Sequence, residues 1–241
     1  MENLHIDNTP VTLVDQVEDR LLDYFKEKNL VSGSAIPTET ELAASLGVAR
    51  SVLREALSRL KMFGMIESRT KRGMVLHEPN LFGGLRRAIN PNLFGESLIY
   101  DILQLRVAIE IGISEAIVQK ITDEDIAELE SIIENGSLSE NNIYVLNSDY
   151  SFHTKLYQIT GNQTIFQFQE IIHPIMAFLR TKFNSTIEPY NIKLRKSGLQ
   201  VTHEDLLEFL KKRDVDGYRD GIKKHLAIYS YLLDLSRKEK P

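Results

Sequence analysis

Apolar residues recur every three or four positions along most of this 241-residue chain, which is the spacing of one face of an α-helix. The first run extends from about Thr12 to Lys28. From Ser97 onward the same periodicity dominates and strand signals are scarce. Further helices are expected at 97–121, 122–135, 143–160, 163–184, 190–213 and 215–237, and a break of the helix 190–213 at Gly198 is left open. The pattern predicts a mainly α protein in which residues 97–241 form an all-α helical bundle.

The composition excludes several classes of protein. The chain has no cysteine, which rules out disulfides, iron–sulfur clusters, thiolate zinc sites and cysteine nucleophiles. No apolar run approaches the ~18 residues that a membrane span needs, and the first residues lack the apolar core of a secretory signal. We therefore expect a cytoplasmic protein with no membrane partner.

Charge is distributed unevenly along the chain. The formal net charge is -5, yet residues 48–76 contain seven basic and two acidic side chains. This segment carries +5, which leaves -10 for the remainder. One interpretation is a small nucleic-acid-binding module joined to an acidic domain, and the other is an ordinary solvated basic surface.

Two short helices follow the first one. Thr38 and Glu41 form a capping box directly after Pro37, so a helix is expected from Glu39 to Leu46, ending at Gly47. A third helix is expected over residues 50–63, ending at Gly64. Three helices in this order are typical of a helix-turn-helix domain.

The third helix has two different faces when it is projected at ~100° per residue. One face is apolar and consists of Val52, Leu53, Ala56, Leu60 and Phe63. The opposite face consists of Arg50, Ser51, Arg54, Ser58 and Lys61. Guanidinium groups one turn apart suit the major groove of double-stranded DNA, where arginine contacts guanine and hydroxyls contact phosphates.

A basic β-hairpin is expected after this helix. Residues 65–68 and 73–76 flank a turn at 69–72, in which Lys71, Arg72 and Gly73 are candidate DNA contacts. The hairpin would be the wing of a winged helix-turn-helix domain spanning residues 1–77. The alternative is a plain amphipathic helix followed by a surface hairpin.

The amino-acid sequence of this region resembles that of the DNA-binding domain of the GntR family of bacterial transcription regulators. The resemblance is carried by IPTETELA at 36–43, GVARSVLREALSRL at 47–60, GMI at 64–66 and RG at 72–73. It implies that Arg50 and Arg54 contact operator bases and backbone, and that Gly73 lies at the tip of the wing.

Two positions depart from the family pattern. Thr40 stands where members often carry arginine, which puts one DNA contact in doubt. Ala49 occupies the N-cap position that usually holds serine or threonine. The loss of a cap costs about 1 kcal/mol and removes a hydroxyl that could contact phosphate. Residues 78–96, rich in proline, glycine and asparagine, are expected to form a linker with a short helix around 81–89.

Polar residues occupy apolar helix faces in the predicted bundle. Asp149 and His153 are one turn apart, and His203 and His225 lie on apolar faces of later helices. Each histidine alone could be an ordinary core residue. Together the four side chains suit a divalent ion, with Zn²⁺ or Ni²⁺ favoured over Mn²⁺. Arg106 also lies within an apolar stripe, formed by Ile102, Leu105, Ile109 and Ile113.

This second region resembles the FCD effector domain of the FadR-type GntR subfamily. The resemblance is carried by DYSFH at 149–153, TGN at 160–162, His203 and His225, and RVAIE at 106–110. It implies that Asp149, His153, His203 and His225 ligate a metal and that Arg106 points into the pocket of a small carboxylate effector. An internal ion pair of Arg106 with Glu110 or Asp149 is the alternative. His173 matches no ligand position and is interpreted as structural.

These patterns together predict a homodimeric, metal-containing transcription regulator, expected to be a repressor rather than an enzyme. Each winged helix would bind one half of a near-palindromic operator. The small carboxylate, for example a sugar acid, a hydroxy acid or a dicarboxylate, would be the signal. The alternatives are a regulator for which the metal itself is the signal and a metal-dependent hydrolase.

Overall fold

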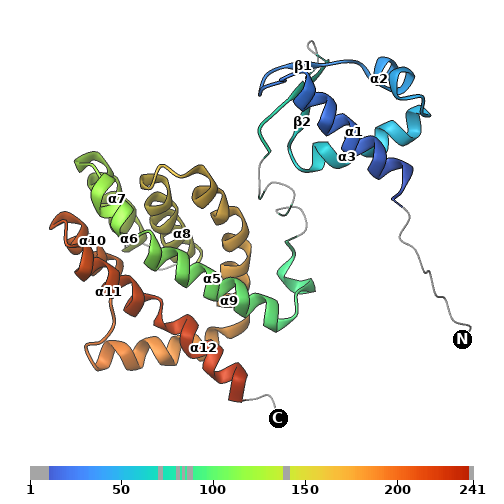
Figure 1. Cartoon of the computed structure of the whole chain (residues 1–241). Coiled ribbons are helices and arrows are strands. Elements are labelled where there is room, and N and C mark those ends of the chain that lie inside the picture. Colours follow the sequence, from blue (N-terminus) through green and yellow to red (C-terminus); the bar gives the residue numbers. More distant parts are fainter. Residues whose placement is uncertain are drawn as a thin grey trace, which may run out of the picture. The chain divides into compact units, whose positions relative to one another are not determined.

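The computed structural model describes residues 11–69, 73–79, 82, 85, 89–137 and 142–238. The chain divides into two compact units, residues 1–87 and 88–241 (Figure 1). Within the described residues, the first unit contains three helices and a small sheet, and the second is helical. The mainly α fold predicted from the periodicity is confirmed.

The first unit consists of α1 (Leu13–Glu27), α2 (Glu39–Leu46) and α3 (Arg50–Met62) beside a three-stranded antiparallel sheet. The predicted capping box of α2 is present, since Thr38 accepts from the Glu41 backbone and Glu41 accepts from the Thr38 backbone. Gly47 ends this helix in the left-handed conformation, with φ of 66°. The core is formed by Val17, Leu21, Phe25, Ile36, Leu42, Leu53, Ala56, Leu57 and Leu60. Phe63, expected in the core, is 48% exposed because α3 ends at Met62.

The helix α3 begins without a side-chain cap. Ala49 has the extended backbone of an N-cap residue, with φ of -65° and ψ of 143°, but no side-chain hydrogen bond. We expect Ala49→Ser to raise the free energy of unfolding by about 1 kcal/mol, because the hydroxyl would bond a free N–H of the first turn. Urea denaturation of the two proteins measures this change. The matched control is Ala44→Ser at an exposed interior position of α2, where no gain is expected.

The sheet contains the expected wing. Strand β2 (Ile66–Arg69) pairs with β3 (Gly73–Leu76), and the two-residue β1 (Ala35–Ile36), which was not predicted, pairs with the other edge of β3. Gly73 faces Arg69 across the hairpin and has a φ of 70°, a conformation that favours glycine. The turn residues Lys71 and Arg72 lie outside the described residues, as does most of the helix expected at 81–89.

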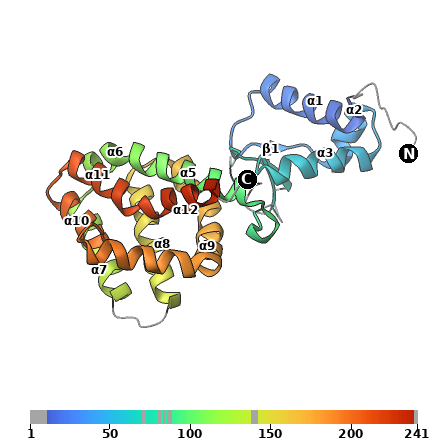
Figure 2. The ribbon, with the colours of Figure 1, turned by 90° about the horizontal axis from the view of Figure 1, so that it is seen from below.

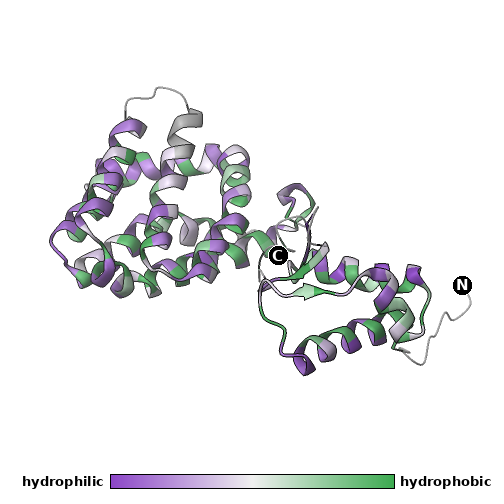
Figure 3. Cartoon of the chain, turned by 90° about the horizontal axis from the view of Figure 1, so that it is seen from above, coloured by the Kyte–Doolittle hydropathy of each residue, from purple (hydrophilic) through white to green (hydrophobic). Residues whose placement is uncertain are grey.

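The second unit begins with the 3₁₀ turn η1 (Pro91–Leu93), followed by a bundle of α-helices. The helices are α5 (Glu96–Gly112), α6 (Ser114–Lys120), α7 (Asp123–Ser137), α8 (Asn142–Ile159), α9 (Gln163–Lys196), α10 (His203–Lys211), α11 (Val215–His225) and α12 (Ala227–Lys238). Helix α8 packs on α7 and α9, and α11 packs on α5, α6 and α10 (Figure 2). Hydrophobic and hydrophilic residues alternate along the helices (Figure 3). The buried residues of this bundle include Leu103, Phe152, Ile175, Leu206 and Ile222.

Three helix boundaries differ from the prediction. The expected helices 97–121 and 215–237 are each interrupted once, at Ile113 and at Leu226. The expected break between Asn184 and Tyr190 is wrong, because α9 continues through Pro189 to Lys196 with a kink at Phe183. The chain leaves this helix at Gly198, whose φ is 66°.

Candidate functional site

The predicted DNA-binding side chains lie on the outer face of α3. Arg50, Ser51, Arg54 and Ser58 are exposed, whereas Leu53, Leu57 and Leu60 on the other side are buried in the core. The helix therefore presents one polar face with two arginines one turn apart. Arg54 Nε lies 2.7 Å from Glu39 Oε2 at the start of α2, and this ion pair lowers the pKa of Glu39.

Arg59 has a different role from the two arginines of the outer face. Its guanidinium lies between α3 and α1, 2.5 Å from Asp15 Oδ1 and 3.7 Å from Glu18 Oε2. It joins two helices of the same unit. Arg50 and Arg54 therefore lie on the outer face of α3, whereas Arg59 pairs with acidic side chains of α1.

Asp149, His153, His203 and His225 come together in the second unit. Asp149 and His153 lie one turn apart on α8, His203 is the first residue of α10 and His225 is the last residue of α11. Each offers one ligand atom, and the four atoms all lie within 4.8 Å of one another. Three helices that are separate in the sequence therefore converge on one point.

The imidazole rings present their Nε2 atoms to the carboxylate. Asp149 Oδ1 lies 3.5 Å from His203 Nε2 and 3.8 Å from His153 Nε2. His225 Nδ1 lies 2.8 Å from the carbonyl oxygen of Val201, which accepts its proton and leaves Nε2 free to act as a ligand. His203 also stacks on the ring of Phe152, with 4.3 Å between centroids.

The charge state of these groups suits metal binding. Burial lowers the pKa of His225 to about 3, and His203 and His153 add to this effect, so the ring is neutral near pH 7. Burial raises the pKa of Asp149, but contact with His203 and the charges of His153 and Arg180 hold it well below its ordinary value. A neutral imidazole and an ionised carboxylate are the forms that ligate a metal.

Arg106, expected to point into an effector pocket, is not among the residues that line the cavity described below. Its side chain is 2% exposed, and Nε donates to Glu110 Oε1 at 2.6 Å. Nη1 donates to the hydroxyl of Tyr229 at 3.3 Å. A guanidinium inside an apolar bundle requires a carboxylate partner, and Glu110, one turn further along α5, supplies it. The ion pair left open as the alternative is the arrangement found.

Glu110 joins this pair to the histidine cluster. Its Oε2 atom lies 2.7 Å from His153 Nδ1, and the hydroxyl of Tyr157 donates to Oε1 at 3.2 Å. Burial raises the pKa of Glu110, but His153 and Arg106 lower it to about 2. From the sequence, Glu110 was expected only as the alternative ion-pair partner of Arg106. A carboxylate one turn from a buried arginine was its only local signal.

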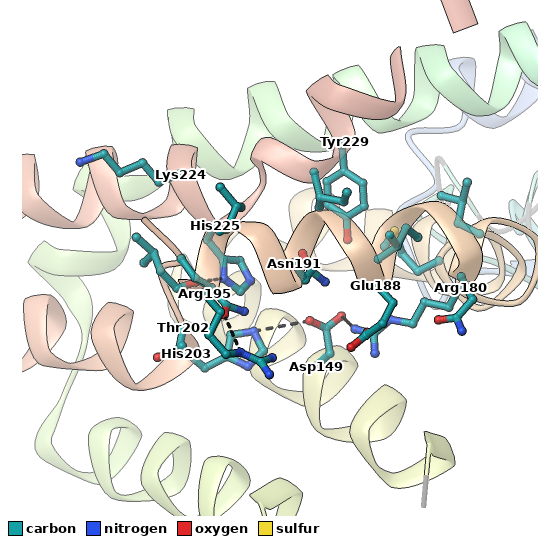
Figure 4. A pocket seen from close by; sticks show the side chains of 18 of the residues that line it. Asp149, Arg180, Glu188, Asn191, Arg195, Thr202, His203, Lys224, His225 and Tyr229 are labelled. Atoms are coloured by element: carbon teal, nitrogen blue, oxygen red, sulfur yellow. Dashed lines mark hydrogen bonds and ion pairs between the residues drawn. The ribbon is translucent and has the colours of Figure 1, made fainter. Parts of the chain in front are cut away.

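A cavity of about 610 Å³ opens beside the cluster. Its lining includes Asp149, His203 and His225 (Figure 4). Arg180 of α9, which the sequence analysis missed, also lines it, with Nη2 3.0 Å from Asp149 Oδ2. Around the rest of the wall lie Asn184, Glu188, Asn191, Arg195, Gln200, Thr202 and Lys224. The walls thus offer amide, hydroxyl and charged groups to a polar ligand.

The four clustered side chains fit a divalent metal. Four buried polar atoms here make no hydrogen bond, which is costly unless another partner satisfies them: both ring nitrogens of His153, Nε2 of His203 and Oε2 of Glu110. Nδ1 of His153 and Oε2 of Glu110 face each other as an ion pair, whereas the two Nε2 atoms face the cluster. Tetrahedral ligands about 2.1 Å from an ion lie about 3.4 Å from one another. Asp149 Oδ1 lies 3.5 Å and 3.8 Å from the Nε2 atoms of His203 and His153, and no two of the four ligand atoms are more than 4.8 Å apart. Three imidazoles and one carboxylate form a donor set that suits Zn²⁺ or Ni²⁺.

Comparison with known families matches both units. The FCD domain family matches residues 101–227, and the family of bacterial regulatory proteins named gntR matches residues 13–76. Within the described part of the chain, no helix has the length and apolar character needed to cross a membrane.

Individual relatives match along nearly the whole chain. A regulatory protein assigned to the L-lactate dehydrogenase operon of Escherichia coli is 28% identical, covering 91% of this chain and 85% of that protein. The HTH-type transcriptional repressor NanR of Cronobacter sakazakii is 25% identical, covering 95% and 88%. A solved structure, GntR of Streptococcus agalactiae, has a TM-score of 0.52 and 23% identity, covers 89% of this chain and 98% of that one, and is similar in fold.

Proposed function

Because this chain belongs to the gntR family of bacterial regulatory proteins and carries an FCD domain, we propose that it is a repressor that releases its operator when a small organic acid binds beside a divalent metal ion. Both domains are those of a DNA-binding transcription regulator rather than of an enzyme, so the hydrolase alternative is set aside. The observation that carries the proposal is the ligand cluster at the wall of a cavity that is lined by both polar and apolar side chains.

Operator binding is assigned to the outer face of α3 and to the wing. Arg50 and Arg54 are placed to contact base edges in the major groove, and Ser51 and Ser58 to contact phosphates. Gly73, Lys71 and Arg72 of the wing are assigned to the adjacent backbone. When Arg54 contacts DNA, its ion pair with Glu39 must weaken or break.

The metal is assigned to Asp149, His153, His203 and His225, with Zn²⁺ or Ni²⁺ as the candidates. When bound, the ion supplies two positive charges and coordination positions that protein ligands leave open. Asp149 and His225 contribute their ligand atoms from the cavity wall, so a bound acid would lie within reach of the same site.

The charge of the cavity supports an anionic ligand. Its wall carries three acidic residues, Asp149, Glu188 and Glu204, and three basic residues, Arg180, Arg195 and Lys224. The formal charges of the wall therefore cancel. A divalent ion would give the site a net positive charge that attracts a carboxylate. Arg180 replaces Arg106 as the proposed cationic partner of the acid, because it is the arginine of the wall beside Asp149.

We also propose that the protein acts as a homodimer. Part of the stripe expected to be the inner face of α5 is exposed: Leu105 is 49% exposed and Leu98, one turn before Ile102, is 46% exposed, whereas Ile113 at the end of the stripe is buried. Ile102 and Ile109 continue the same stripe and are partly exposed. A second copy covering this stripe would supply the second winged helix that a near-palindromic operator requires.

Operator release tests the proposed function. Duplex DNA selected from a random pool by the protein serves as the operator, and fluorescence anisotropy measures binding. We expect protein loaded with Ni²⁺ or Zn²⁺ to lose at least about tenfold in operator affinity with one of L-lactate, L-malate or D-gluconate, which corresponds to a coupling free energy of about 1.4 kcal/mol. Protein stripped with EDTA should bind operator and ignore the acids.

Two outcomes would contradict this proposal. Release caused by the metal alone, without any acid, would make the ion itself the signal. Equal release by stripped and loaded protein would remove the metal from the mechanism.

A further inference from the structure

We infer that Glu110 is a positioning residue of the metal centre, whose carboxylate holds the proton of His153 on Nδ1 and so leaves Nε2 as the ligand atom. This inference rests on the proposed function, because it concerns how one proposed ligand is oriented. It assigns a role to the buried Arg106–Glu110 pair, which the cavity does not use.

The two nitrogens of His153 face different partners. Nδ1 lies 2.7 Å from Glu110 Oε2, and Nε2 faces Asp149 Oδ1 at 3.8 Å. A neutral imidazole has one N–H donor and one acceptor nitrogen. An acceptor nitrogen placed 2.7 Å from a carboxylate oxygen would bring two lone pairs together, so of the two neutral tautomers the geometry favours the one with the proton on Nδ1. In that tautomer Nε2, the nitrogen on the side of Asp149, is the one that can ligate a metal.

Glu110 is itself held in place. Its other oxygen, Oε1, accepts from Arg106 Nε at 2.6 Å and from the Tyr157 hydroxyl at 3.2 Å. Glu110 and Arg106 are each 2% exposed and His153 is 1% exposed. A carboxylate with these partners in a packed interior has little freedom to turn, so the orientation of His153 is set by α5.

A second histidine of the cluster shows the same arrangement with a different anchor. His225 donates from Nδ1 to the carbonyl oxygen of Val201, and its Nε2 belongs to the cluster. Metal-binding histidines generally donate their other N–H to a carboxylate or a carbonyl, which fixes the tautomer and the ring orientation. In this chain α5 supplies the carboxylate and the segment before α10 supplies the carbonyl.

The tautomer can be measured directly in metal-free protein. Long-range ¹⁵N–¹H NMR of the full chain with labelled histidine distinguishes Nδ1–H from Nε2–H, and His153→Gln assigns the signal. We expect His153 to be the Nδ1–H tautomer. The Nε2–H tautomer in the unaltered protein would overturn the inference without any variant at Glu110.

Metal affinity gives the second test. We expect Glu110→Gln to weaken Ni²⁺ binding 10- to 100-fold, measured by competition with a chromophoric chelator, and to mix the two tautomers of His153. Tyr157→Phe is the matched control, because it removes a hydrogen bond to the other oxygen of Glu110 and leaves Oε2 ionised. It should change Ni²⁺ affinity less than threefold.

Folding is controlled with a double variant. If Glu110→Gln does not fold because Arg106 loses its counter-charge, Arg106→Gln combined with Glu110→Gln removes both charges and should show the same loss of Ni²⁺ affinity. A folded Glu110 variant that binds Ni²⁺ as tightly as the unaltered protein would overturn this inference and leave the proposed function standing. Failure of the unaltered protein to bind Ni²⁺ or Zn²⁺ would overturn the proposed function and the inference with it.

Discussion

His153→Ala should bind operator as tightly as the unaltered protein and should fail to release it when the acid is added. The substitution removes one of the four clustered ligands and leaves the outer face of α3, in the other unit, unchanged. Loss of a residue that merely supports a ligand costs 10- to 100-fold in metal affinity, so loss of a ligand itself should cost more than about 100-fold. Glu110 keeps Arg106 as its ion-pair partner, so no buried charge is left alone.

The control for this variant is His173→Ala. His173 lies on α9, is exposed and contacts Tyr150 rather than the cluster. It should retain both Ni²⁺ binding and the acid response in the same anisotropy assay. If His153→Ala is destabilised, His203→Ala removes a less buried ligand of the same set. Normal release of operator by either metal-deficient variant would show that the metal is not part of the sensor.

The parts predicted correctly from the sequence are those with local signals. The bounds of α2 follow from the Thr38 capping box and from Gly47, both of which act within a few residues. The pairing of Asp149 and His153 follows from helical spacing alone. Bringing His203 and His225 to the same point depends on how three helices pack, and here the resemblance to a known domain supplied what spacing could not.

The face of α5 shows why other predictions failed. This helix is apolar on nearly every side, so periodicity does not distinguish the inner stripe from the outer one. The predicted inner stripe includes Leu105, which is 49% exposed, while Leu103, Arg106 and Glu110 are buried. The gap expected between residues 184 and 190 is also absent, since α9 continues through Pro189, a residue type that disfavours helix interiors. Arg180 lies beside Asp149 only through tertiary packing, so no sequence pattern indicated its role.

Replacing the arginines of the outer face of α3 should weaken specific DNA binding without affecting the metal centre. We expect Arg54→Ala to cost about 1–3 kcal/mol of operator affinity, a fivefold to 150-fold loss, and to relax discrimination at one base position. Arg50→Ala should behave similarly, and the double variant should lose about the product of the two factors. Anisotropy titrations at several salt concentrations separate base from phosphate contacts, since each lost phosphate contact lowers the salt slope by about one.

Arg59→Ala is the matched control for these arginine variants. It removes the same charge from the same helix, but this guanidinium is bonded to Asp15 of α1 and lies away from the outer face. The variant should lose stability and keep the operator affinity and salt slope of the folded protein. Because the net charge changes equally in all three single variants, a general electrostatic effect would lower affinity in all of them alike. Equal losses from Arg59→Ala and Arg54→Ala would therefore contradict a specific DNA-reading face on α3.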